Sequence, residues 1–260
     1  MKKSLFLFLC ALCMFFSSCV KASHKSLLDQ VKAKGELVVA LEGAWEPWNY
    51  HDEHGRLVGF DVDVAKEMCK RMGVRAKFVE FEWERLFSCL ENGECDIIVN
   101  GVAITTERKN RFYYTTPYAV EKTALIVRKD ENGINSFEDL AGKTSANSLY
   151  STYDNIAKKY GAMSIVVDTF DETMELLLSN RADSTINSIL VYYNYVKNNP
   201  NAPVKIAAIL DDAFQIAIPC RKSVESQSLL EEMNRAIDSM KADGTLANIS
   251  AAYFGLDVAK

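Results

Sequence analysis

Short apolar runs alternate with helix-patterned segments along most of this chain. The run Glu36–Leu41 has no polar alternation, which is typical of a β-strand that is buried on both faces. From Asp61 the apolar residues recur at helical spacing until Gly73, and glycine commonly ends a helix. Strands that alternate with helices of this length predict βαβ units and parallel strand pairing.

The alternation occurs in two sets. The first set predicts strands at 36–41, 74–81 and 96–99, and helices at 61–72 and 84–90. The second set predicts strands at 124–127, 164–167, 184–186 and 214–219, and helices at 151–160, 172–178, 189–197 and 226–241. One compact sheet does not comfortably hold so many units, so we expect two α/β lobes. The pattern alone leaves open whether the last helices return to the first lobe.

The first residues have the composition of an export signal. Lys2 and Lys3 precede the apolar run 5–16, which is shorter than the roughly 20 residues that a permanent membrane helix needs. Two serines then stand directly before Cys19. This arrangement resembles the bacterial lipobox, where the chain is cut before a cysteine whose thiol carries a diacylglycerol.

From this resemblance we expect residues 1–18 to be a lipoprotein signal peptide and residues 19–26 a tether, with Cys19 as the lipidation site. The mature protein would then be extracytoplasmic, in the periplasm or at the cell surface, and anchored to the membrane. Ordinary cleavage a few residues later, for example after Ala22, is the alternative.

Charge and motif content exclude several classes of function. The net charge is −5 and no basic run exceeds two residues, whereas a nucleic-acid-binding protein needs a basic face. The three histidines lie in polar segments, and the sequence has no zinc-like Cys/His spacing, P-loop or nucleophile elbow. We therefore expect no metal, no cofactor and no nucleic-acid partner.

Four cysteines follow Cys19, namely Cys69, Cys89, Cys95 and Cys220. An even set in an exported protein can form disulfides. However, Cys69 and Cys89 lie on apolar faces of predicted helices, where cysteine usually acts as a small hydrophobic residue. We expect buried thiols, and the sequence leaves their pairing open.

Candidate binding residues lie in the loops that follow predicted strands. Glu42 and Trp45 come directly after the first strand, and Trp83 follows the second. Ligands bind outside the carboxyl ends of the strands in open α/β sheets. Two tryptophans within four residues, Trp45 and Trp48, beside a glycine and an acid make a stacking site as well supported as ordinary packing, whereas Trp83 taken alone would be a core residue.

The loop after the strand at 96–99 has the character of an anion site. Gly101 and Ala103 would let backbone N–H groups approach an anion, and Arg108 offers a planar, two-pronged donor to a carboxylate. Taken alone, the loop also fits an ordinary polar connection with a surface arginine.

Several segments resemble the bacterial extracellular solute-binding proteins of polar amino-acid ABC transporters. They are GELVVALEGAWEPWNYHDEHGRLVGFDVDVAKEM, ENGECDIIVNGVAITTERKNRFYYTTPYAV, DLAGKTSANSLYSTYD and MKADGTLANISAAYFG. The resemblance runs from about Leu27 to Lys260. Within the family, the opening LLDQVKAKGELVVALEG and the ending are similar to the cystine-binding branch.

The resemblance implies a two-lobed fold of the type II periplasmic-binding-protein kind. Each lobe would be an α/β unit with a mixed sheet flanked by helices, and two crossover strands, at 124–127 and within 214–219, would form the hinge. Lobe 1 would consist of residues 27–124 and 216–260, and lobe 2 of residues 125–215. The ligand would lie in the cleft between them.

The resemblance also implies roles for the loop residues. Trp45 and Trp83 fall where the family sandwiches its ligand between aromatic rings. Gly101, Ala103 and Arg108 fall at its α-carboxylate site. An amino acid is a zwitterion, and burying either of its charges unpaired is costly, so such a cleft must answer both.

In lobe 2, Tyr150 and Ser151 fall on the family's second carboxylate loop, at a helix N-terminus that suits an anion, and Asn147 is a further expected ligand-binding residue. One further position departs from the family pattern. The family usually has an Asp for the ligand's amino group where this chain has Ser188, preceded by Asn187.

Because Ser188 and Asn187 offer only neutral oxygens, we expect Glu42 to supply the missing charge from lobe 1. The two lobe 2 residues would then add hydrogen bonds to the same amino group. The alternative is that Glu42 faces solvent at the rim of the cleft.

The resemblance implies the substrate-binding component of an amino-acid ABC importer, a monomer that delivers its ligand to a membrane permease. The ligand would be a polar amino acid, with cystine as the first expectation, and the protein would have no catalytic role. Two alternatives stay open. One is a cyclohexadienyl-dehydratase-like enzyme with Glu42 as general acid. The other is a ligand-sensing lipoprotein without a transporter.

Overall fold

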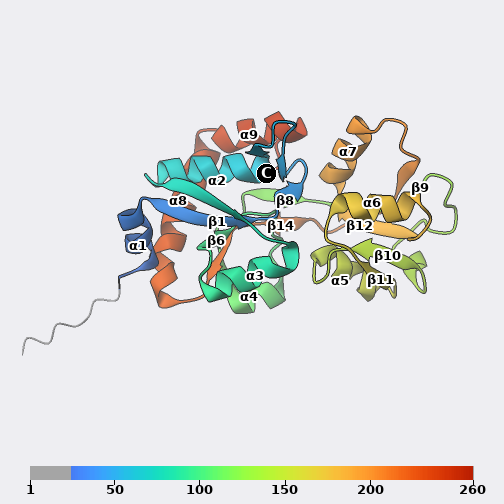
Figure 1. Ribbon diagram of the computed structural model, residues 1–260, viewed down its shortest axis with the longest axis horizontal. Coiled ribbons are helices and arrows are strands. Elements are labelled where there is room, and N and C mark those ends of the chain that lie inside the picture. The colour runs from blue at the N-terminus through green and yellow to red at the C-terminus, as the bar shows by residue number, and fades with distance from the viewer. Residues whose placement is uncertain (1–24, 260) are drawn as a thin grey trace, which may run out of the picture.

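Two mixed five-stranded sheets, each flanked by helices, lie side by side along the long axis of the molecule (Figure 1). The coordinates are a computed structural model that describes residues 25–259. The expected signal peptide and the lipidation site Cys19 lie outside the described residues. Within the described part of the chain, no helix has the length and apolar character needed to span a membrane.

The first sheet, which defines lobe 1, has the strand order β5-β1-β6-β15-β7. Strand β1 pairs in parallel with β5 and β6, and β15 pairs antiparallel with β6 and β7. The sheet is therefore mixed. Its strands are β1 (Glu36–Leu41), β5 (Arg75–Glu80), β6 (Ile97–Ile98), β7 (Phe112–Tyr114) and β15 (Pro219–Arg221).

Side chains of β1 alternate between two buried clusters, one on each face of the sheet. Leu37 and Val39 pack with the helices of one face, whereas Val38 and Ala40 pack against the helix that carries Leu86 on the other. The prediction of a strand buried on both faces is confirmed. The helices of this lobe are α1 (Leu27–Lys34), α2 (Phe60–Arg71), α3 (Trp83–Asn92), α4 (Thr106–Arg111), α8 (Gln227–Ala242) and α9 (Thr245–Phe254), with a short 3-10 helix η2 (Val224–Ser226).

The last helices return to lobe 1, which the sequence pattern left open. Leu229, Met233 and Ile237 of α8 are fully buried in the same cluster as Leu37 of β1. The loop after β1 adds a small sheet of β2 (Ala44–Trp45), β3 (Asn49–His51) and β4 (Leu57–Val58). All four cysteines of the described chain, Cys69, Cys89, Cys95 and Cys220, are free and buried, as expected.

The second sheet, which defines lobe 2, has the order β11-β10-β12-β9-β13. Strand β10 pairs in parallel with β11 and β12, and β9 pairs antiparallel with β12 and β13. The strands are β9 (Thr123–Arg128), β10 (Thr144–Asn147), β11 (Met163–Val166), β12 (Ser184–Ser188) and β13 (Val204–Ile209). The helices are η1 (Glu138–Leu140), α5 (Thr152–Lys159), α6 (Phe170–Leu178) and α7 (Ile189–Asn198).

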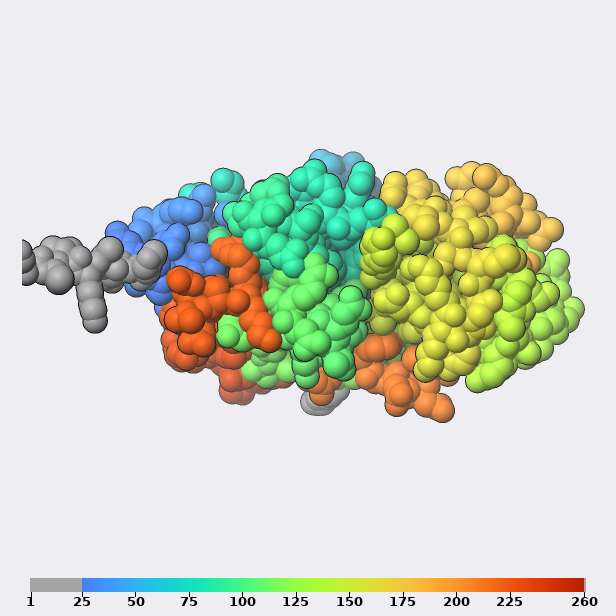
Figure 2. All heavy atoms as spheres, turned by 90° about the horizontal axis from the view of Figure 1, so that it is seen from below, coloured from blue at the N-terminus to red at the C-terminus, as the bar shows by residue number. Residues whose placement is uncertain are grey.

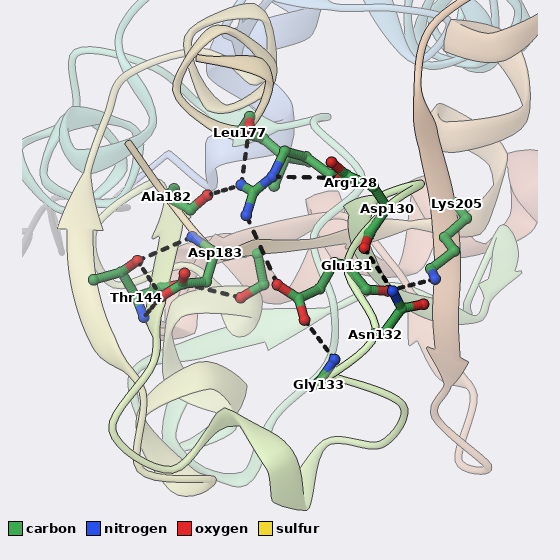
Figure 3. A network of polar contacts seen from close by, with 11 residues as sticks. Arg128, Asp130, Glu131, Asn132, Gly133, Thr144, Leu177, Ala182, Asp183 and Lys205 are labelled. Carbon is green, nitrogen blue, oxygen red and sulfur yellow. Dashed lines mark hydrogen bonds and ion pairs between the residues drawn. The ribbon is translucent and has the colours of Figure 1, made fainter. Parts of the chain in front are cut away.

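Arg128 is the last residue of β9, at the end of lobe 2 that lies away from lobe 1, and it hydrogen-bonds to neighbouring segments (Figure 3). Its Nη1 donates to the carbonyl oxygens of Leu177 and Ala182 at 3.1 and 2.7 Å. The Asp183 carboxylate accepts hydrogen bonds from the backbone N and the hydroxyl of Thr144, both at 2.8 Å. These bonds fix the turn that leads into β12, and thereby the position of the residues at the other end of that strand.

The crossover between the lobes differs in part from the prediction. Strands β8 (Ala119–Glu121) and β14 (Phe214–Ile216) form an antiparallel pair between the two sheets (Figure 1). The prediction of a crossover at 214–219 is confirmed for β14, and the last residue of that run, Pro219, begins β15. The assignment of residues 124–127 to the other crossover is wrong, because they are fully buried inside the lobe 2 sheet between β12 and β13. The lobe boundaries themselves stay a prediction.

Candidate functional site

A cavity lies between the lobes, next to the crossover strands. Figure 2 shows that the segments around α3 and α4 of lobe 1 meet those around α5 of lobe 2 along one boundary. The cavity brings together most of the predicted site residues from five segments of the chain and from both lobes. Eight of them line it: Glu42, Trp45, Trp83, Gly101, Ala103, Arg108, Asn147 and Asn187. Their contact with a ligand stays a prediction.

Three predicted site residues do not line this cavity. The hydroxyls of Ser151 and Ser188 instead cap helices, accepting hydrogen bonds from the backbone N–H groups of Asp154 at 3.0 Å and Leu190 at 3.2 Å. The side chain of Tyr150 is largely exposed on the outer side, and its backbone has a left-handed φ of 58°. A serine at the start of a helix is a strong cap, which the loop pattern did not reveal.

Arg108 lies at the junction of the lobes and is 8% exposed. Its Nη1 donates to the carbonyl oxygen of Ala103 at 3.2 Å and to the hydroxyl of Thr152 in lobe 2 at 3.3 Å, and its Nη2 donates to the Tyr150 carbonyl oxygen at 3.4 Å. Trp83 stacks on the guanidinium, with its ring centroid 5.2 Å from Cζ. Trp83 thus supports the arginine as well as lining the cavity.

None of the ion pairs formed by residues 25–259 includes Arg108. Burial removes water from the guanidinium and destabilises its charged form, and this lowers the pKa of Arg108. A buried guanidinium that hydrogen-bonds only neutral oxygens is well placed to bind an anion, because a carboxylate would pair with it in two-pronged geometry.

Trp45 forms part of one wall of the cavity, with Trp48 packed behind it. Trp45 stacks on Trp48 with 5.2 Å between ring centroids and 9° between planes, and Trp48 itself is fully buried. The indole N–H of Trp45 donates across the cleft to Asn187 Oδ1 at 3.4 Å. Gly101 has a left-handed φ of 53°, and a Cβ at that position would lie 2.4 Å from the Trp45 ring. Glycine is therefore required where this loop passes the tryptophan.

Two acidic side chains sit on the lobe 1 side. Glu42 accepts a 2.6 Å hydrogen bond from Asn100 Nδ2, and burial, partly offset by that bond, raises its pKa to about 7. Behind it, Asp61 accepts hydrogen bonds from the Tyr118 hydroxyl at 2.6 Å and from Asn49 Nδ2 at 3.1 Å. Burial raises the pKa of Asp61 to about 7 as well. Glu42 lines the cavity and is half-buried there.

A third acid, Glu121 of crossover strand β8, lines the cavity and was missed by sequence reasoning. It is 3% exposed, and burial raises its pKa to about 8. The predicted site residues follow from the loops at strand ends, whereas Glu121 lies within a strand that joins the lobes. The sequence feature that could have identified Glu121 is the presence of an acid within the largely apolar segment that follows Pro117 and Tyr118.

From the raised pKa values of Glu42, Asp61 and Glu121 we predict that the ligand-free protein becomes less stable as the pH rises. Each has a folded-state pKa above its unfolded value, so the folded state retains protons that the unfolded state has lost. Their contribution is full below about pH 4.5 and is lost as the pH rises through about 7 to 8. We expect a melting temperature several degrees lower at pH 8.5 than at pH 5.5, measured by calorimetry. A melting temperature that rises over this interval would contradict the assignment of raised pKa values.

The fold and the interlobe cavity define a two-lobed solute-binding protein. The chain belongs to the bacterial extracellular solute-binding proteins, family 3, whose sequence profile matches residues 37–256. The expected family and fold are thereby confirmed. It is 35% identical over 240 residues to the L-cystine-binding protein TcyA of Bacillus subtilis, covering 92% of this chain and 88% of that protein.

Two solved structures have the same fold. An ancestral arginine-binding protein bound to arginine has a TM-score of 0.80 and 36% identity, covering 85% of this chain and 99% of that one. The ancestral amino acid-binding protein AncCDT-1, a precursor of cyclohexadienyl dehydratase, has a TM-score of 0.80 and 29% identity, covering 88% and 100%. Among the described residues, no cluster of His, Cys, Asp or Glu has the arrangement of a metal site.

Proposed function

We propose that this protein binds an amino acid in the interlobe cavity and delivers it to the permease of an ABC importer, without a catalytic role. Its membership of the solute-binding family and its similarity to amino-acid-binding proteins support the transport function. The observation that carries the proposal is the buried Arg108, which both lobes contact and no described carboxylate neutralises. An α-carboxylate would complete this site.

The cavity also suits the rest of an amino acid. Trp45 offers an apolar face, and an ammonium near an aromatic face gains about 0.5–2 kcal/mol of cation–π attraction. Because Arg108 and Trp45 of lobe 1 already contact lobe 2, a ligand held between them would stabilise the closed arrangement of the lobes. We place the hinge at β8 and β14.

The ligand we propose first is cystine, and arginine is the second candidate. The similarity to the cystine-binding protein TcyA and to an arginine-binding protein supports this order. Both ligands carry two nitrogen cations, and the acids that line the cavity include Glu42 and Glu121. We propose that Glu42 contacts the bound amino acid. We further propose an extracytoplasmic monomer anchored through a lipid on Cys19, as the sequence predicts.

The experiment that tests this function is a thermal-shift screen of the purified residues 19–260 with cystine and each common amino acid. A ligand at about 100 times its Kd stabilises the protein by about 2.7 kcal/mol, so cystine or arginine should raise the Tm by several degrees. Aliphatic amino acids without a second cation serve as matched controls. The absence of a shift with every amino acid would refute amino-acid binding.

A second candidate function is a dehydratase-like elimination from a cyclic substrate. The similarity to AncCDT-1, and Glu42 with a pKa near 7 in the cavity, favour it because such a reaction needs a general acid. Incubation with a cyclohexadienyl substrate and detection of released carbon dioxide tests it. Formation of product by the wild type and not by Glu42→Gln would favour the enzyme over the transport protein.

A further inference from the structure

Glu121 has the surroundings of a binding group. It belongs to β8, in register with Phe214 of β14, so its backbone is fixed by the crossover pair at the floor of the cavity. Its Oε1 accepts a 2.5 Å hydrogen bond from the Tyr153 hydroxyl. Its Oε2 is buried without a hydrogen bond of normal geometry among the described residues. No ion pair of the described residues includes Glu121.

Ser188 lies against the same carboxylate. Burial raises the pKa of Glu121, and the nearby Ser188 hydroxyl offsets part of that rise. The chain brings the two together because Ser188 of β12 pairs with Thr123 of β9, two residues after Glu121. The backbone N of Ile189 also donates to the carbonyl oxygen of Lys122 at 3.0 Å. Glu121 of β8 therefore lies near Ser188, the position where the family pattern would put an acid.

Glu121 is also coupled to the carboxylate-binding arginine through consecutive residues of one helix. At the start of α5, the Thr152 hydroxyl contacts Arg108 and the next residue, Tyr153, contacts Glu121. The cation and the acid are thus held by neighbouring residues of one helix, and both line the same cavity. Glu42, by contrast, is held by Asn100 on the lobe 1 side of the cavity.

We propose that Glu121 is the anionic partner of the ligand's α-amino group, taking the role of the acid that is missing at Ser188. The assignment rests on the proposed amino-acid binding. Arg108 would hold the carboxylate and Glu121 the ammonium of the same ligand. Glu42 would then be free to bind a second cationic group or the ligand's side chain.

Calorimetry with two matched pairs of compounds tests the assignment. The pairs are L-arginine with 5-guanidinopentanoic acid, and L-cystine with 3,3′-dithiodipropionic acid; the second member of each lacks the amino groups. Removing one partner of a buried charge pair predicts that Glu121→Gln weakens binding of the amino acid by about 30-fold or more. Its affinity for the deaminated analogue should stay close to that of the wild type. Glu42→Gln is the matched control and should still distinguish the members of the arginine pair.

An exchange variant provides an independent measurement. The double variant combines Glu121→Gln with Ser188→Asp, which places the acid on β12. It should bind the amino acid at least about tenfold more tightly than Glu121→Gln alone. The ligand-free melting temperature of each variant shows whether it is folded. Wild-type affinity of Glu121→Gln for the amino acid, or an undiminished preference of this variant for the amino compound, would overturn the assignment while amino-acid binding stands. Failure of the wild type to bind any amino acid would overturn both proposals.

Discussion

Arg108→Ala is expected to weaken amino-acid binding by about 2–5 kcal/mol, the range for removing one partner of a buried charge pair. The guanidinium is buried between the lobes and hydrogen-bonds only neutral oxygens, so the ligand's carboxylate would be its anionic partner. Without it, the carboxylate would be buried with backbone donors alone. Isothermal titration calorimetry with cystine and arginine measures the loss.

Arg111→Ala is the matched control for this substitution. Arg111 lies on the same helix α4, is half exposed, and forms an ion pair with Glu91 at 2.8 Å. Such an exposed pair contributes about 0–1 kcal/mol to stability, and Arg111 does not line the interlobe cavity. Binding by Arg111→Ala should therefore match the wild type. Near-native affinity in Arg108→Ala would show that the carboxylate binds elsewhere.

Gly101→Ala is expected to reduce both binding and stability. The added Cβ would lie 2.4 Å from the Trp45 ring, which cannot retreat easily because it is stacked on the fully buried Trp48. Overpacking of this kind costs about 1–3 kcal/mol. The left-handed backbone at φ 53° adds about 1–2 kcal/mol for a residue with a Cβ. Since Trp45 forms a wall of the cavity, its displacement should lower the affinity by about tenfold or more.

Gly35→Ala separates the two causes. Gly35 ends helix α1 with a similar φ of 69°, but a Cβ there would have no atom within 4 Å. This variant should show the backbone cost in thermal unfolding and bind ligand like the wild type. If both variants lose the same stability and neither loses affinity, Trp45 accommodates the methyl group and its position does not control binding.

The local pattern of apolar residues was sufficient to predict the strands and helices that carry the site. The run Glu36–Leu41 is β1 with the predicted bounds, and the predicted helix at 61–72 is α2, shifted by one residue. Burial on both faces of a strand or one face of a helix leaves a periodic record in the sequence. The loops after these strands converge on the cavity, because the carboxyl ends of the parallel strands β1 and β6 lie at the same edge.

Long-range pairing decided what the pattern could not. Residues 124–127 read as a crossover strand, yet their place between β12 and β13 depends on partners some 60 to 80 residues later. The hydroxyls of Ser151 and Ser188 cap helices α5 and α7, and their predicted contact with a ligand stays a prediction.

The sequence by itself determined the alternation of strands and helices, the family, and the loops that supply Trp45, Gly101 and Arg108 to one cavity. Only the tertiary structure placed the carboxylate of Glu121 beside Ser188 and joined it through Tyr153 to the helix that contacts Arg108. The physical reason is that burial periodicity is a property of neighbouring residues. The partner of a buried charge, in contrast, is set by which strands and helices the fold brings together.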